Sequence, residues 1–321
     1  MTDHAPVAQS EARPAFTADG APAPAAKPAR KHGWREEAKS IFWLVLAVLG
    51  FHSFIAKPFY IPSESMLPGL LIGDRLVVTK YPYGWSWVSP TIPNPVAIFR
   101  GFVLHQSVDS YGVQLPFTRG RLLGRLPERG DVVIVTPPGT NTDYIKRVIG
   151  LPGDTLEVRG GAVILNGVPL KRGAIHDELL PIDANSQCPA ADYPGARETL
   201  PDGRAVCRLP LVRETLPGGR SYDTVELGWS PGDDYGPIKI PADHVFLMGD
   251  NRDRSADSRF PGGESKGLGG PVPWENIGGR AEFITFSLDG DATLNPLTWW
   301  GSLRAGRAGG TLHPTKAPAA K

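Results

Sequence analysis

The sequence has 321 residues, enough to bury a sizeable core as one large domain or two modest ones. Its 34 basic and 33 acidic side chains nearly cancel to a formal net charge of +1, which removes any electrostatic case for nucleic-acid binding. The 38 glycines and 33 prolines fall mostly at segment ends, a pattern typical of many short strands joined by turns rather than of long helices.

The chain begins with a segment rich in alanine and proline, residues 1–35, which cannot form a packed core and is expected to be disordered. A transmembrane anchor is predicted over 36–57, because residues 40–56 carry no Asp, Glu, Lys or Arg. A buried core helix is disfavoured because the run shows no amphipathic period. A cleavable signal peptide is disfavoured too, since a cut after Ala56 would place the large Phe54 where a small residue is needed.

Positive charge flanks the anchor unequally. Only Lys57 and Arg75 follow the uncharged stretch 40–56 within about 20 residues, whereas five basic residues precede that stretch: Lys27, Arg30, Lys31, Arg35 and Lys39. This bias predicts a cytoplasmic N-terminus, a lipid bilayer as partner, and the rest of the chain on the outer side of the inner membrane. In that compartment Cys188 and Cys207 can close a disulfide, the alternative being two free thiols.

Short apolar runs beyond the anchor predict strands at 70–79, 132–135, 144–149, 245–248 and 281–288, with a hairpin over 155–165 around Gly160 and Gly161. Residues 81–128 are irregular and rich in Trp, Tyr and Phe, which fits either a local core or a surface at the bilayer interface. Residues 166–242 read as loop-rich. They contain both cysteines but no catalytic motif, so reduction of a disulfide there is expected to affect stability more than activity.

One serine and one lysine carry the chemistry that the sequence indicates. Pro62 and Pro68 bracket Ser65 and argue against a helix through it. Alternation along a strand places Lys146 on one face with Tyr144 and Val148. Burial there would lower the pKa of the lysine. A serine becomes a nucleophile when a base takes its proton, and a neutral lysine can be that base.

Three segments place this pair in a family. They are PSESM, YIKRVIGLPGD and GDNRDRSADSR, at 62–66, 144–154 and 249–259. In this order behind an N-terminal anchor, they resemble the type I bacterial signal peptidases, membrane-bound serine proteases that remove signal peptides from exported proteins. GDRLVV at 73–78 and RGDVV at 129–133 extend the likeness, which covers roughly residues 40–288. The resemblance implies Ser65 as nucleophile and Lys146 as general base.

The resemblance also assigns supporting roles. Ser63 would donate its hydroxyl to the oxyanion beside the Ser65 N–H, and Ser255 would hydrogen-bond the lysine and fix its direction. Asp257 and Arg259 would form a supporting charged pair.

The fold that the resemblance implies is mainly β, with a membrane-anchored β-rich catalytic core and one N-terminal transmembrane helix. The core would comprise residues 58–153 and 244–288, a smaller β-rich domain would be inserted at 154–243, and 289–321 would form a C-terminal tail.

The predicted function is that of a membrane-bound serine endopeptidase that removes signal peptides from exported preproteins with a Ser-Lys dyad. No cofactor or metal is expected, because HExxH, CxxC and phosphate-loop motifs are missing from the sequence. One alternative is a specialised relative that processes a pilus or conjugation protein. Another is a catalytically inactive, membrane-anchored β-domain that acts as a binding module. A self-cleaving repressor would need a DNA-binding head where residues 1–57 offer an anchor.

Overall fold

A computed structural model describes residues 33–86, 88–89, 96, 120–137, 140, 142–291 and 298–316. Of residues 1–35, which are predicted to be disordered, 1–32 lie outside the described residues, while Trp34 and Arg35 already belong to a helix. Most of the aromatic segment 81–128 also lies outside the described residues. The chain divides into two units, Met1–Leu46 and Ala47–Lys321, and each is described by itself.

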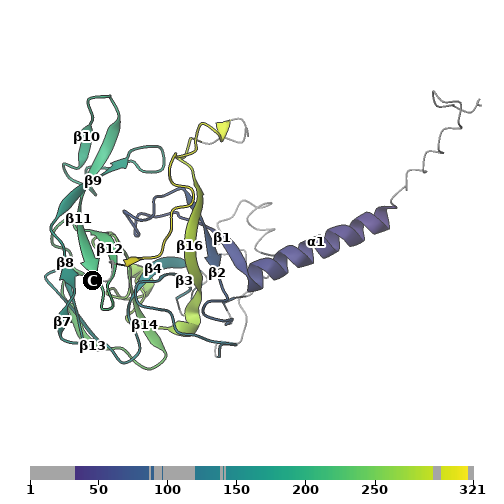
Figure 1. Cartoon of the computed structure of the whole chain (residues 1–321), viewed down its shortest axis with the longest axis horizontal. Coiled ribbons are helices and arrows are strands. Elements are labelled where there is room, and N and C mark those ends of the chain that lie inside the picture. Colours follow the sequence, from purple (N-terminus) through teal and green to yellow (C-terminus); the bar gives the residue numbers. More distant parts are fainter. Residues whose placement is uncertain are drawn as a thin grey trace, which may run out of the picture. The chain divides into compact units, whose positions relative to one another are not determined.

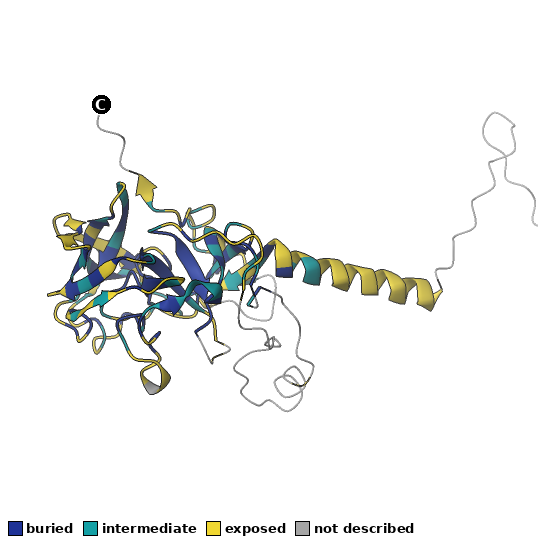
Figure 2. Cartoon of the chain, turned by 90° about the horizontal axis from the view of Figure 1, so that it is seen from below, coloured by how far each residue is buried: buried dark blue, intermediate teal, exposed yellow. Residues whose placement is uncertain are grey.

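The predicted anchor forms a single helix, α1 (Trp34–Phe54), with Glu36 and Glu37 in its first turn, where the helix dipole favours acidic side chains. It is long and apolar enough to cross a membrane, since its 21 residues span about 31 Å at 1.5 Å per residue. Its side chains are almost all exposed (Figure 2), unlike those of a core helix. The helix ends before the predicted boundary at 57, because β1 begins at Ala56.

The central sheet has seven strands in the order β1-β2-β16-β3-β4-β14-β15, and every neighbouring pair is antiparallel (Figure 1). Its strands are β1 (Ala56–Tyr60), β2 (Asp74–Thr79), β3 (Val132–Val135), β4 (Tyr144–Gly150), β14 (His244–Met248), β15 (Val272–Pro273) and β16 (Ile277–Ser287). Short 3₁₀ helices, η2 (Gly263–Ser265) and η3 (Trp274–Asn276), lie on either side of β15. The mainly β fold is therefore confirmed.

One strand starts later than predicted. Residues 70–73 form turns, and β2 begins only at Asp74. Gly73 explains the break, because its φ is +97° and a Cβ there would lie 2.1 Å from the carbonyl oxygen of Leu288. Only glycine tolerates that backbone conformation and that close approach.

Residues 154–243, called here the inserted region, fold into two further sheets. The hairpin predicted around Gly160 and Gly161 is confirmed as β5 (Thr155–Arg159) and β6 (Ala162–Leu165). These strands join β7 (Val168–Pro169) and β13 (Tyr235–Lys239) in a four-stranded sheet. The other sheet contains β8 (Lys171–Arg172), β9 (His176–Pro181), β10 (Arg197–Thr199), β11 (Ala205–Thr215), β12 (Arg220–Val225) and β17 (Thr315–Lys316).

Apolar clusters join the inserted region to the central sheet. One cluster combines Phe246 and Met248 of β14 with residues of β5, β6 and β12, and another combines Leu67 and Leu71 with residues of the inserted region around Leu211. Cys188 and Cys207 form the predicted disulfide within the second cluster. The division into a core and an inserted domain stays a prediction.

The described residues of the region predicted as a tail pack on the body. Leu312 is buried in the same cluster as Met66, and β17 pairs with β12. Arg304 forms an ion pair with Asp183 at 2.7 Å and donates to the carbonyl oxygen of Ile72 at 2.6 Å. These contacts tie the C-terminal segment to the central sheet, to the sheet that contains β12, and to the loop that carries Ser65.

Candidate active site

Ser65 lies on the loop between β1 and β2, and the fold holds this loop at both ends. The backbone of Ile61 pairs with Asp74 and Gly73, while Met66 and Leu70 are buried in the core below. Ser65 itself is 7% exposed. Its carbonyl oxygen accepts a hydrogen bond from the Asn251 N–H at 3.2 Å, which connects the loop to the segment that follows β14.

Lys146 lies on β4 and reaches Ser65 directly. Its Nζ is 2.9 Å from the Ser65 Oγ, and the side chain is buried. Opposite Lys146 on β3 stands Val133, and the Lys146 Nζ is 5.7 Å from the centre of the Tyr144 ring, so the predicted alternation is confirmed. The structure thus brings together the two residues that the sequence singles out, although they are 81 positions apart.

Burial of the ammonium group sets the protonation of Lys146. It lowers the pKa of Lys146 from 10.5 to about 8, because the charged form loses its hydration. The Asp257 and Asp250 carboxylates oppose this shift, and the Arg259 guanidinium adds to it. A lysine with this pKa is neutral in a substantial fraction of molecules near neutral pH, and in that form its Nζ can accept the Ser65 proton.

Ser63 also lies within reach of Ser65. Its Oγ is 3.3 Å from the Ser65 Oγ, and its side chain is exposed. In the described part of the chain, the Ser65 N–H donates to no backbone carbonyl. The Ser63 hydroxyl and the Ser65 N–H are therefore both available beside the Ser65 Oγ.

Asp257 and Arg259 form the predicted buried ion pair, with the Arg259 Nη2 at 2.9 Å from the Asp257 Oδ2. Asp257 also accepts the Gly249 N–H at 3.0 Å, and Arg259 donates to the carbonyl oxygen of Arg252 at 2.6 Å. Burial alone would raise the pKa of Asp257, but the Arg259 charge and these hydrogen bonds outweigh it and hold that pKa below its ordinary value. The pair thereby fixes the whole 249–259 segment as a rigid turn beside Lys146.

Ser255 departs from its expected role. Its Oγ is buried and has no hydrogen-bond partner among the described residues, so the bond expected from Ser255 to Lys146 is not formed in this structure. The hydroxyl instead lies against Gly249, where a Cβ would be only 2.2 Å from the Ser255 Oγ and 2.4 Å from the Ser65 carbonyl oxygen. Glycine at 249 lets the two motifs approach this closely.

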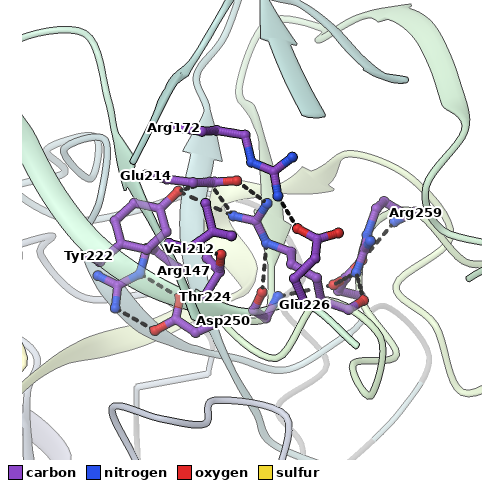
Figure 3. Close-up of polar contacts among 12 residues, drawn as sticks. Arg147, Arg172, Val212, Glu214, Tyr222, Thr224, Glu226, Asp250 and Arg259 are labelled. Carbon is purple, nitrogen blue, oxygen red and sulfur yellow. Dashed lines mark hydrogen bonds and ion pairs between the residues drawn. The ribbon is translucent and has the colours of Figure 1, made fainter. Parts of the chain in front are cut away.

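A buried charged network lies next to the site and was only partly visible in the sequence (Figure 3). The Arg147 Nε and Nη2 donate to the two Asp250 carboxylate oxygens at 2.7 and 2.6 Å, and the guanidinium lies 4.3 Å from the centre of the Tyr222 ring. Arg252 forms a similar two-point bridge to Glu214, at 2.7 and 2.6 Å. Both arginines stand in the conspicuous sequence motifs, Arg147 in the segment 144–154 and Arg252 in the segment 249–259. Neither Glu214 nor Tyr222 carried a sequence signal, because each comes from the inserted region.

Comparisons with known proteins identify the family of this chain. A family model described as signal peptidase, peptidase S26, matches residues 34–286. A signal peptidase I of Rickettsia bellii (strain OSU 85-389) is 31% identical over 83% of this chain and 76% of its own length. A signal peptidase I of Rickettsia typhi (strain ATCC VR-144 / Wilmington) is 31% identical over 83% of each chain.

A solved structure of a signal peptidase I from Enterococcus faecalis V583 is 22% identical, with a TM-score of 0.25, and covers 49% of this chain and 97% of that one. A similarity this low does not bear on the fold. The match of the family model and the identity to full-length relatives do decide the family, and the chain belongs to the type I signal peptidases.

Proposed function

We propose that this chain is a membrane-bound serine endopeptidase that removes signal peptides from exported preproteins, with Ser65 as nucleophile and Lys146 as general base. The contact of 2.9 Å between the Lys146 Nζ and the Ser65 Oγ carries the proposal, together with the burial of this lysine. The contact also disfavours the inactive binding module, since a buried lysine placed against a serine hydroxyl, with no ion-pair partner among the described residues, costs stability that catalysis would justify.

The chemistry follows from the positions of the two side chains. Neutral Lys146 takes the proton of the Ser65 hydroxyl as Oγ attacks the scissile carbonyl carbon, and the carbonyl oxygen becomes an oxyanion. The Ser65 N–H and the Ser63 hydroxyl are placed to donate to that oxygen. Lys146 then gives its proton to the leaving amine, and an acyl-enzyme remains on Ser65. A water molecule that loses its proton to Lys146 attacks the ester, which releases the signal peptide and restores the Ser65 hydroxyl.

The anchor and its flanking charge support a location at the inner membrane. Helix α1 has the length and apolar composition of a membrane span, and the excess of Lys and Arg before it favours a cytoplasmic N-terminus. Ser65 follows the last residue of α1 by only eleven positions, and eleven extended residues span at most about 40 Å. The nucleophile therefore stays close to the membrane surface, where the end of a signal peptide emerges.

The test uses the full chain purified in detergent and a preprotein substrate. Ser65→Ala and Lys146→Ala should each abolish cleavage, and the double variant should lose little more, because the two residues act as a unit. Ser265→Ala and Lys239→Ala, which change exposed residues of the same types outside the site, serve as controls. Substantial cleavage by either folded single variant would refute the assignment of the dyad.

A further inference from the structure

Tyr193 comes from the inserted region yet touches the loop that carries the nucleophile. It lies between β9 and β10 and is 2% exposed. Its hydroxyl donates to the Glu64 Oε2 at 2.6 Å, and Glu64 stands directly before Ser65 in the chain. Burial and the hydrogen bond to Glu64 raise the pKa of Tyr193, so the hydroxyl keeps the proton that it donates.

Asn251 closes this contact into a ring of hydrogen bonds. Its Nδ2 donates to the Tyr193 hydroxyl at 3.3 Å and to the carbonyl oxygen of Glu64 at 3.1 Å. Its backbone N–H donates to the Ser65 carbonyl oxygen at 3.2 Å. The two peptide carbonyls on either side of the Ser65 N–H are thereby held by one residue, Asn251, whose side chain also bonds to Tyr193. A small rotation of this peptide would turn the Ser65 N–H away from the oxyanion.

The disulfide fixes the position of Tyr193. Cys188 lies five residues before Tyr193 in the same loop, and Cys207 lies on β11, so the disulfide joins this loop to the sheet of the inserted region. Tyr193 and both cysteines belong to one apolar cluster, which also contains Leu67 and Leu71 of the nucleophile loop.

A second contact joins the loop that carries Tyr193 to the segment 249–259. The Arg254 Nη1 is 2.7 Å from the Asp192 Oδ1, and its Nη2 donates to the Asp192 carbonyl oxygen at 2.8 Å. The segment 249–259 therefore holds Tyr193 and its neighbour at two points, through Asn251 and through Arg254.

We propose that Tyr193 is a positioning residue that sets the nucleophile loop through Glu64 and Asn251, and that the disulfide holds Tyr193 in place. This inference rests on the proposed function, in which Ser65 is the nucleophile. It differs from the expectation that reduction acts mainly on stability. The inserted region carries no residue of the dyad, yet through this link its redox state acts on the rate of acyl transfer.

The experiment measures kcat and KM for the full chain in detergent at a temperature well below unfolding. Tyr193→Phe removes only the hydroxyl and should lower kcat roughly tenfold while KM changes less than about twofold, because a hydrogen bond to a carboxylate that orients the loop is lost. Glu64→Gln keeps an acceptor and should retain more activity than Glu64→Ala. The double variant of Tyr193→Phe with Glu64→Ala should lose far less than the product of the two single losses. Tyr81→Phe, which removes an exposed hydroxyl, is the matched control.

Reduction tests the part played by the disulfide. A water-soluble phosphine supplies two electrons to the S–S bond, and one water molecule supplies the oxygen of the resulting phosphine oxide and the protons of the two thiols. Reduced wild-type protein should fall to the kcat of Tyr193→Phe, and reduction of Tyr193→Phe should change kcat little further. Cys188→Ser with Cys207→Ser should reproduce the reduced state without any reductant.

The outcomes separate the inference from the proposed function. Wild-type kcat in folded Tyr193→Phe, with Ser65→Ala inactive, would overturn the positioning role and leave the dyad intact. Full multiplicative losses for Tyr193→Phe and Glu64→Ala would overturn it as well, since they would show that the two residues act on kcat independently. A loss on reduction that adds fully to the loss in Tyr193→Phe would overturn the role of the disulfide. Cleavage by Ser65→Ala would overturn both proposals.

Discussion

The pH dependence of cleavage should report the buried lysine. The pKa of Lys146 is about 8, so about one tenth of the molecules carry a neutral base at pH 7 and about one hundredth at pH 6. The value of kcat/KM should therefore rise about tenfold per pH unit below pH 8 and level off above it. With the ordinary pKa of 10.5 the neutral fraction at pH 8 would be about 150-fold smaller, which is the part of the rate that burial supplies.

Two neighbouring charges allow the sign of this reasoning to be tested. The Asp257 carboxylate raises the pKa of Lys146 and the Arg259 guanidinium lowers it. Asp257→Asn should therefore move the rise in kcat/KM to lower pH, and Arg259→Gln should move it to higher pH. Each variant leaves a buried charge without its partner, at about 3–5 kcal/mol of stability, so the amount of folded protein must be measured alongside.

The assay is the initial rate of preprotein cleavage between pH 5.5 and 10 at constant ionic strength. His244→Gln is the control, because the His244 ring bonds only the nearby carbonyl oxygen of Ala242 among the described residues. A rise centred near pH 10.5 would show that burial does not act on the base. Shifts in the same direction for both charge variants, or a rise abolished by His244→Gln, would refute the assignment of Lys146 as the base.

Three further predictions concern individual side chains. Ser63→Ala should lower kcat by roughly 10²–10³, as loss of one oxyanion donor does elsewhere, and Ser63→Thr should retain more, whereas a plain turn serine would change kcat little in steady-state assays. Lys146→Met should raise the free energy of unfolding by up to about 3 kcal/mol below pH 8, because the folded pKa lies below the unfolded one and the unfolded chain binds the extra proton. This gain should vanish as the pH rises from 8 to 10.5, and chemical denaturation at several pH values would show it. Asp250→Ala should lower the free energy of unfolding by about 3–5 kcal/mol, because it leaves Arg147 buried without its carboxylate. Asp223→Ala breaks a more exposed ion pair and is the control. A smaller drop in melting temperature for Asp250→Ala than for Asp223→Ala would contradict this prediction.

Local patterns in the sequence predicted the elements that local physics controls. The apolar run 132–135 has the same bounds as β3, and the glycine pair at 160–161 marks the turn between β5 and β6. Motif order also predicted that Ser65 and Lys146 would meet, although no local pattern reports their distance of 2.9 Å. The start of β2 was predicted too early, because the break at Gly73 depends on its approach to Leu288, more than two hundred residues away.

Contacts between segments that are distant in the sequence could not be predicted either, because no local pattern reports them. Glu214 is an ordinary acidic residue on β11 until Arg252, 38 positions later, turns it into half of a buried ion pair. Tyr193 likewise stands in a loop without any motif, and its bond to Glu64 spans 129 positions. The hydrogen bond expected from Ser255 to Lys146 is not formed, and no sequence pattern reports that the Ser255 Oγ lies against Gly249 instead. Sequence therefore indicates candidate catalytic residues more readily than the residues that hold them in place.

Two adjacent basic residues on β4 show how the fold divides their roles. Lys146 and Arg147 point to opposite faces of the strand, because alternate residues of a strand do so. On one face Arg147 meets the Asp250 carboxylate at two points, and although burial works against the charge, Asp250 raises the pKa of Arg147 above its ordinary value. On the other face no carboxylate within the described residues forms an ion pair with Lys146, so burial dominates and the pKa of Lys146 falls.

The register of β4 therefore decides the chemistry. Its partners place Lys146 opposite Val133 on β3 and Arg147 opposite Met248 on β14. A slip by one residue would exchange the faces, which would turn Lys146 away from Ser65 and Arg147 away from its place at Asp250. The Arg147–Asp250 pair opposes such a slip, because the slip would leave a buried carboxylate without its guanidinium. The ion pair on one face of the strand thus stabilises the register that places Lys146, which has no ion-pair partner among the described residues, beside Ser65 on the other face.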